Sequence, residues 1–130
     1  MPVTPKRRHH ILVAEDDAAV RKMIGHFLEE IADVTTAKDG MEALGFLRDM
    51  EKAPDLIITD LMMPRLDGLG LLKRVRANET SKDIPIIILT AKAQPMDVVT
   101  GINAGARHYL IKPFKREELL EKVRRVLRLD

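Results

Sequence analysis

Short apolar runs rich in branched side chains recur along this chain, separated by segments with helical spacing. Four runs are continuous: Ile11–Ala14, Leu56–Ile58, Ile86–Leu89 and Tyr109–Ile111. A fifth, Asp33–Ala37, is half polar and is expected to form an edge strand. Continuous rather than alternating apolar runs are typical of parallel strands that helices cover on both faces.

The segments between these runs carry apolar residues at the spacing of amphipathic helices. The second begins with Asp39–Glu42 (DGME), which predicts a capping box, and Pro95 and Gly105 mark the ends of the fourth. Strands alternating with helices predict an α/β domain of (βα)₅ form with a doubly wound, five-stranded parallel sheet. The apolar positions that define the other helices are Val20, Ile24, Phe27, Leu28 and Ile31, then Leu69, Leu72 and Val75, and finally Leu119, Leu120, Val123 and Leu127.

Length and composition favour one domain without disulfides or thiolate metal sites. The chain has 130 residues and no cysteine, and its net charge of +2 comes from 22 basic and 20 acidic residues. That balance gives no argument for direct nucleic-acid binding. We expect residues 1–8 to be a basic leader and residues 9–130 the domain. The apolar run after the leader is too short to insert in a membrane, so we expect a cytoplasmic protein.

Polar side chains follow four of the predicted strands. Glu15 and Asp16 follow the first strand, and Asp60, Thr90 and Lys112 follow the third, fourth and fifth. In a parallel sheet these ends share one edge, which would gather three carboxylates and one ammonium. Two like charges about 4 Å apart repel by roughly 4 kcal/mol at an effective dielectric near 20. Such a cluster must take up protons or hold a cation.

The donor types of this cluster restrict the cation. All are hard oxygens, which select Mg²⁺ or Mn²⁺ over zinc or copper. Magnesium keeps several waters and often shares its site with phosphate, which points to phosphoryl chemistry. Each residue alone has an ordinary structural interpretation, such as a helix N-cap for Asp17. Their coincidence at four strand ends favours a functional site.

Four segments, ILVAEDD, PDLIITDLMMPRLDG, PIIILTAKA and AGARHYLIKPF, resemble the receiver domain of bacterial two-component response regulators. The resemblance is chemotaxis-regulator-like and covers about residues 9 to 128. It implies a flavodoxin-like strand order of 2-1-3-4-5. It also implies that Asp60 is both the phosphoacceptor and a ligand of Mg²⁺. Asp16 would hold Mg²⁺ directly and Glu15 through water. The backbone carbonyl of Met62 would complete the protein's share of the coordination.

The resemblance also implies a switch around the phosphoryl group. Lys112 matches the lysine that pairs with this group, and its bond to Pro113 is expected to be cis. Thr90 matches the hydroxyl that closes on the phosphoryl oxygens, and Tyr109 the aromatic that turns inward as Thr90 moves. The readout would be the surface of the fourth helix, fifth strand and fifth helix.

Other positions are expected to modulate or support the switch. Met62 and Lys92 match places that influence the lifetime of the phosphate, while Asp67 and Gly68 match a structural turn. His108 lies where many family members that dimerise through this face have an acidic residue, which puts that dimer in doubt. We also predict that the helix within 95–105 is the least stable, since valine, threonine and glycine have low helix propensity.

The expected function is a phosphorylation-controlled signalling switch, a self-catalysing phosphoacceptor rather than an enzyme. Its partners would be a sensor histidine kinase or phosphotransfer protein, and a downstream protein target or output domain. One alternative is a receiver-like scaffold that works without phosphorylation. Another is a hydrolase of the haloacid dehalogenase type, although its nucleophile follows the first strand. A flavodoxin-type carrier is disfavoured because EDDAAV would repel phosphate.

Overall fold

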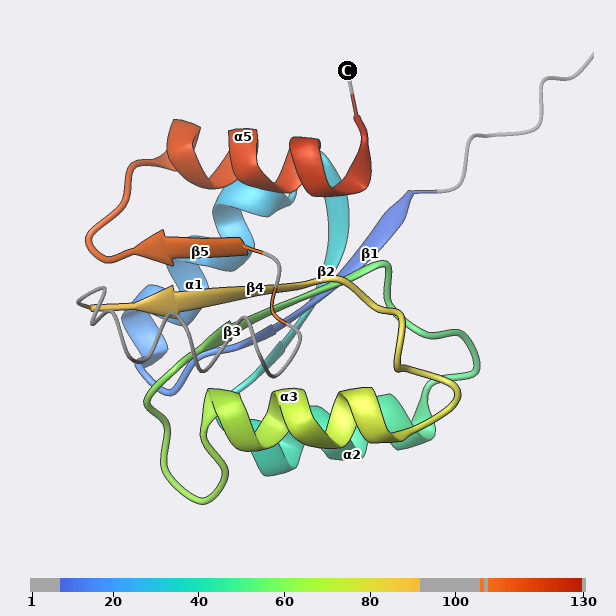
Figure 1. Ribbon diagram of the computed structural model, residues 1–130. Helices are drawn as coiled ribbons and strands as arrows, with labels where there is room; N and C mark the ends of the chain where they lie inside the picture. Colours follow the sequence, from blue (N-terminus) through green and yellow to red (C-terminus); the bar gives the residue numbers. More distant parts are fainter. Residues whose placement is uncertain (1–7, 92–105, 107, 130) are drawn as a thin grey trace, which may run out of the picture.

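The computed structural model describes residues 8–91, 106 and 108–129. Its strands form one parallel sheet in the order β2-β1-β3-β4-β5, which confirms the predicted topology. Figure 1 shows this sheet between two layers of helices. The strands are β1 His9–Ala14, β2 Ala32–Ala37, β3 Leu56–Asp60, β4 Ile86–Thr90 and β5 His108–Ile111.

The helices of the described residues cover both faces of the sheet (Figure 1). The helices α1 (Ala18–Leu28) and α5 (Arg116–Leu127) pack on one face, and α2 (Gly40–Asp49) and α3 (Gly68–Ala77) on the other. The predicted helix between Pro95 and Gly105 lies outside the described residues, as does the prediction that it is the least stable. None of the described helices is long and apolar enough to cross a membrane.

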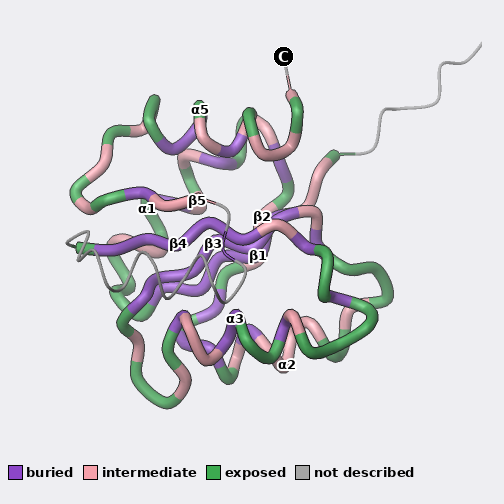
Figure 2. The backbone as a smooth tube through the Cα atoms, in the orientation of Figure 1, coloured by how far each residue is buried: buried purple, intermediate pink, exposed green. Residues whose placement is uncertain are grey.

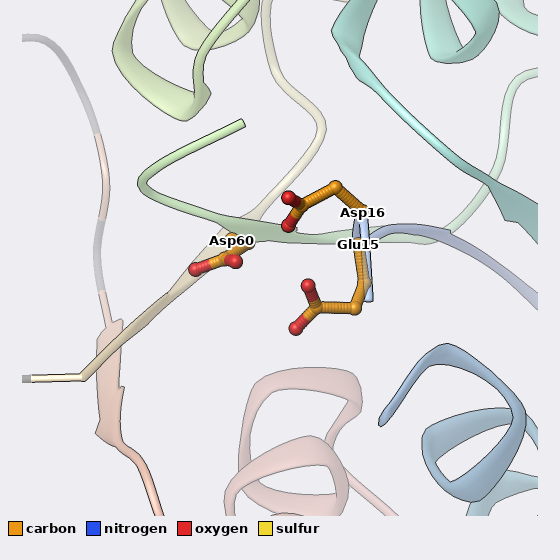
Figure 3. Close-up of side chains that lie close together, drawn as sticks. All are labelled: Glu15, Asp16 and Asp60. Atoms are coloured by element: carbon orange, nitrogen blue, oxygen red, sulfur yellow. The ribbon is translucent and has the colours of Figure 1, made fainter. Parts of the chain in front are cut away.

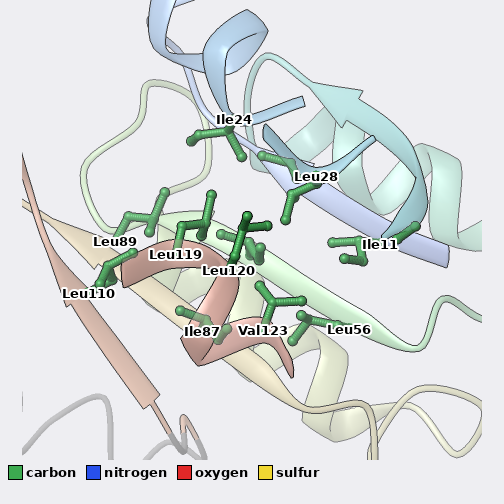
Figure 4. Packing of buried hydrophobic residues seen from close by; sticks show 13 residues of the cluster. Ile11, Ile24, Leu28, Leu56, Ile87, Leu89, Leu110, Leu119, Leu120 and Val123 are labelled. Atoms are coloured by element: carbon green, nitrogen blue, oxygen red, sulfur yellow. The ribbon is translucent and has the colours of Figure 1, made fainter. Parts of the chain in front are cut away.

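The strands supply both hydrophobic cores, because successive side chains point to opposite faces. On β1, Ile11 and Val13 face α1 and α5, whereas Leu12 and Ala14 face α2 and α3. Figure 2 shows that the buried backbone follows the strands, and Figure 4 shows the core beneath α1 and α5. Burial on both faces explains why the runs are continuously apolar.

An aspartate caps the start of three helices. Asp17, Asp39 and Asp67 each accept the backbone N–H three residues ahead, at 3.0, 2.8 and 2.8 Å. The predicted N-cap at Asp17 is therefore confirmed. The predicted capping box at α2 is only half right: the Glu42 carboxylate accepts the N–H of Lys38, not that of Asp39.

The predicted elements match the structure with small differences at their ends. Each strand is one or two residues longer than predicted. The added residues still pair in the sheet, and all of them are polar except Ala32 of β2. The first helix ends at Leu28, so Ile31 lies beyond it, although its side chain still packs against the core. The Lys112–Pro113 peptide bond is cis, as expected.

Candidate phosphoacceptor and metal site

Three carboxylates meet at the carboxyl edge of the sheet (Figure 3). One oxygen each from Glu15, Asp16 and Asp60 lies within 4.8 Å of the others. Glu15 and Asp16 follow β1, and Asp60 ends the neighbouring β3. Glu15 is fully buried and Asp60 nearly so, while Asp16 is exposed. The cluster therefore has a closed side and a side open to water.

The Lys112 ammonium lies between two of these carboxylates. It pairs with Glu15 Oε1 and lies 3.1 Å from Asp60 Oδ2. Its backbone N–H donates to the Thr90 carbonyl over 2.7 Å, which extends the pairing of β4 and β5 by one residue. The sheet itself thus brings Lys112, 52 residues from Asp60 in sequence, into the cluster.

Burial dominates the electrostatics of Glu15. Loss of solvent raises its pKa to about 7, although the Lys112 ammonium and the Asp17 N–H lower it and the charge of Asp60 raises it. Burial lowers the pKa of Lys112, but the Glu15 hydrogen bond and the charge of Asp60 outweigh this, so that pKa lies above its ordinary value. Near neutral pH, Glu15 therefore carries a proton part of the time. Proton uptake is one of the two outcomes predicted for this cluster.

The donor set fits the other predicted outcome, a bound divalent cation. The three clustered groups are all carboxylates, the oxygen ligands that Mg²⁺ and Mn²⁺ prefer. The exposed side at Asp16 leaves room for the waters that Mg²⁺ retains. The acidic cluster therefore fits a magnesium site.

The backbone around Asp60 is held closely. The Thr59 hydroxyl donates to the Asp60 carbonyl over 3.0 Å, and the Gly68 N–H donates to the Leu61 carbonyl over 2.9 Å. A Cβ at Gly68 would overlap the Asp60 carbonyl oxygen and lie 3.0 Å from Leu61 Cα. The structural role expected for Gly68 thus has a definite cause, the close approach of α3 to the end of β3.

Arg21 also holds the acidic turn, although the sequence did not predict this. Its guanidinium Nη1 donates to the carbonyl oxygens of Glu15 at 2.9 Å and Asp16 at 3.4 Å. Those bonds hold the backbone of the acidic turn from the first turns of α1. The only signal was its position four residues after the N-cap Asp17, which turns its side chain back toward the start of the helix.

The remaining predicted residues lie at different distances from this edge. Thr90 is the last residue of β4 and is nearly buried, and Tyr109 lies in β5, packed against the core beneath α2 and α3. Met62 is 74% exposed in the loop after β3. His108 is the first residue of β5. Lys92 lies outside the described residues.

Comparison with known proteins gives one consistent result. The family model of the response regulator receiver domain matches residues 11–124. Response regulator MprA of Mycobacterium sp. is 44% identical over 91% of this chain and 50% of its own length. The DNA-binding dual master transcriptional regulator RpaA of Synechocystis is 40% identical over 91% of this chain and 48% of its own. The chain thus spans about half the length of the curated relatives it matches.

Solved structures share the fold over nearly their whole length. Chemotaxis protein CheY4 of Vibrio cholerae is 35% identical with a TM-score of 0.87, covering 92% of this chain and 99% of that one. The receiver domain of sensor histidine kinase PA1611 from Pseudomonas aeruginosa is 34% identical with a TM-score of 0.83, covering 93% and 98%. That structure has a magnesium ion coordinated in its active-site cleft.

Proposed function

Because this chain belongs to the response regulator receiver family, a group of phosphorylation-controlled switches, we propose that Asp60 is its phosphoacceptor. The observation that carries the proposal is the meeting of Asp60 with Glu15, Asp16 and Lys112 at one edge of the sheet. A carboxylate needs no general base, since it is already ionised. An Asp60 oxygen forms the new bond to phosphorus, and the donor group leaves with the electrons of the old bond.

The other residues of the site neutralise and orient charge in this transfer. Asp16 directly, Glu15 through water, and Asp60 with the Met62 carbonyl would hold Mg²⁺, or Mn²⁺ in its place. The bound ion supplies positive charge for the phosphoryl oxygens. Lys112 holds Asp60 Oδ2 before the reaction and then pairs with the phosphoryl group. Glu15 pairs with Lys112 and so keeps its ammonium beside Asp60.

Thr90 and Tyr109 carry the signal to the surface. The Thr90 hydroxyl closes on the phosphoryl oxygens, and the Tyr109 ring turns inward into the space this leaves. The readout is the surface of residues 95–105, β5 and α5. Met62, exposed beside the site, and Lys92 modulate the lifetime of the phosphate. Residues 9–130 make up this receiver unit, and residues 1–8 are a basic leader.

Receiver domains interact with histidine kinases and with output domains. We propose a sensor histidine kinase or phosphotransfer protein as the phosphoryl donor, which places the reaction in the cytoplasm. The receiver acts on a downstream protein target or output domain. The relative RpaA is a DNA-binding regulator about twice this length, but for the receiver unit itself we propose no direct contact with nucleic acid. Phosphoryl transfer and dephosphorylation are self-catalysed, without turnover of another substrate.

Intact mass after incubation with acetyl phosphate and Mg²⁺ tests the proposal. The expected result is one added phosphoryl group, absent from Asp60→Asn and from a sample treated with a chelator. An adduct that persists in Asp60→Asn would overturn the assignment. No adduct on the wild type would instead support a phosphorylation-independent scaffold, and turnover of a phosphate ester would support a hydrolase.

A further inference from the structure

The loop after the phosphoacceptor strand (residues 61–67, the β3–α3 loop) is tied to the start of α2. The Gly40 N–H donates to the Leu66 carbonyl over 3.2 Å, and the Leu66 N–H donates to the Pro64 carbonyl over 2.8 Å. A Cβ on Gly40 would overlap the carbonyl oxygen and side chain of Leu66. The two segments therefore pack backbone to backbone.

The carboxylate of Asp39 joins the same two segments by a second link. Its Oδ1 accepts the Glu42 N–H over 2.8 Å, which caps α2. Its Oδ2 lies 3.5 Å from Arg65 Nη1 in the β3–α3 loop. Asp39 is only 2% exposed. A buried carboxylate needs such partners, since an unpaired charge away from water is costly.

Arg65 has a backbone conformation that arginine rarely adopts. Its φ is +69°, in the left-handed region. This conformation is unfavourable for a residue with a Cβ and persists only where its surroundings hold it. Here the Asp39 carboxylate contacts the Arg65 side chain, which is 62% exposed, and the Leu66–Gly40 contact holds the next residue. The turn is thus fixed from α2.

A shift at this turn would reach the metal site. Met62, whose carbonyl is proposed to bind the metal, lies three residues before Arg65. Pro64 lies between them, and its ring fixes one backbone torsion near −65°. Few freely rotating backbone bonds separate Arg65 and Met62. A movement of Arg65 is therefore expected to move Met62 as well.

We propose that Asp39 is a positioning residue for the phosphorylation site. Its carboxylate clamps Arg65 and so fixes the β3–α3 loop in the conformation that presents the Met62 carbonyl to the cation. This inference rests on the proposed function of Asp60 and Met62. Asp39 acts only through Arg65 and through its cap on α2, and touches none of the reacting groups.

Three variants separate the clamp from the cap. Asp39→Ser keeps an N-cap oxygen, since serine is a good cap, but cannot reach Arg65. Arg65→Gln keeps the Cβ and removes the charge, while Arg65→Lys restores the charge. Arg48→Gln is the matched control, because Arg48 is an exposed arginine paired only with its neighbour Asp49 among the described contacts.

The readouts are the Mg²⁺ dissociation constant of the unphosphorylated protein, from amide chemical shifts, and the phosphorylation rate from acetyl phosphate. Asp39→Ser and Arg65→Gln are each expected to weaken Mg²⁺ binding about tenfold, the lower end of the effect for groups that orient metal ligands. The double variant is expected to be no weaker than either single one. Arg65→Lys should recover most of the affinity, and Arg48→Gln should match the wild type.

Two different failures can be told apart. If the wild type binds Mg²⁺ and is phosphorylated while Asp39→Ser and Arg65→Gln match it, the clamp is wrong and the proposed function stands. If the wild type does neither, the proposed function fails first. Loss of affinity in Asp39→Ser with a matching loss of α2 helicity, and none in Arg65→Gln, would assign Asp39 to the cap alone and overturn the clamp.

Discussion

Ile58 and Asp60 lie two residues apart on β3, on the same face of the sheet, and both are almost fully buried. Ile58 packs in the core beneath α1 and α5, where burial of its side chain stabilises the fold. Asp60 lies where the same strand reaches two other carboxylates and Lys112. Burial therefore stabilises the fold at Ile58, whereas at Asp60 it places a charge next to other charges away from water.

The same contrast holds on β1, where Ile11–Ala14 precede Glu15. The apolar part of each strand makes the sheet rigid, and the rigid sheet then holds like charges close together at its edge. Chain relaxation cannot separate these charges without disturbing the strands. Protons, Lys112 or a divalent cation must therefore offset their repulsion. The stable core therefore holds the charged cluster in place.

We expect the largest effects from substitutions at Ile58, which should lower stability, and at Asp60, which should prevent phosphorylation. Ile58→Ala should lower the free energy of unfolding by about 3 kcal/mol, because it leaves a cavity in a fully packed core. Asp60→Asn should abolish phosphorylation without such a loss, since it removes one of the repelling charges. Denaturant unfolding and intact mass measure the two effects. A stability loss in Asp60→Asn as large as that in Ile58→Ala would break the contrast.

A substitution at the junction should affect both properties. In Gly68→Ala the new methyl group overlaps the Asp60 carbonyl oxygen, so the backbone of β3 or α3 must shift. We expect a loss of about 2 kcal/mol, typical of overpacking, together with slower phosphorylation. Gly45→Ala is a suitable control, because its Cβ would meet only the end of Arg48 at 3.9 Å. Unchanged stability in Gly68→Ala would mean that this contact is not tight.

Stability without Mg²⁺ should fall as pH rises between 4.5 and 7. Burial raises the pKa of Glu15 from 4.5 to about 7, so in this range the folded protein binds more protons than the unfolded chain. The contribution of Glu15 is therefore fully present below pH 4.5 and lost as pH passes 7, on the order of 1–3 kcal/mol. Thermal unfolding across this range should show the slope in the wild type and a flatter curve in Glu15→Gln. If stability instead rises between pH 4.5 and 7 in the wild type but not in Glu15→Gln, the pKa of Glu15 is not raised.

The smallest effect concerns the helix caps. Asp67→Ala removes the acceptor for the Gly70 N–H at the start of α3 and should cost about 1 kcal/mol. Asp67→Ser should recover most of this, since serine also caps. Urea unfolding measures both variants. Equal loss in the alanine and serine variants would show that Asp67 does more than cap.

Local patterns were enough to predict the sheet and the residues at its carboxyl edge. The strand order was predicted from the resemblance to the receiver family. They worked because continuous apolar runs and the Asp17 cap are local features. Asp39 and Arg65 are 26 residues apart, and no periodicity relates them. Arg21 donates to backbone carbonyl oxygens, and every residue has such an oxygen, so the residue types do not reveal these bonds. Contacts of these kinds depend on how turns approach each other after folding.

The fold holds Glu15, Asp16 and Asp60 together, and we expect them to form one cation site. A Mg²⁺ titration followed by backbone amide shifts tests it most directly, with Asp16→Asn and Asp60→Asn beside the wild type. The expected result is one saturable transition centred on residues 15, 16 and 60–62, strongly weakened in both variants. Shifts that do not saturate, or an affinity unchanged in both variants, would contradict the account.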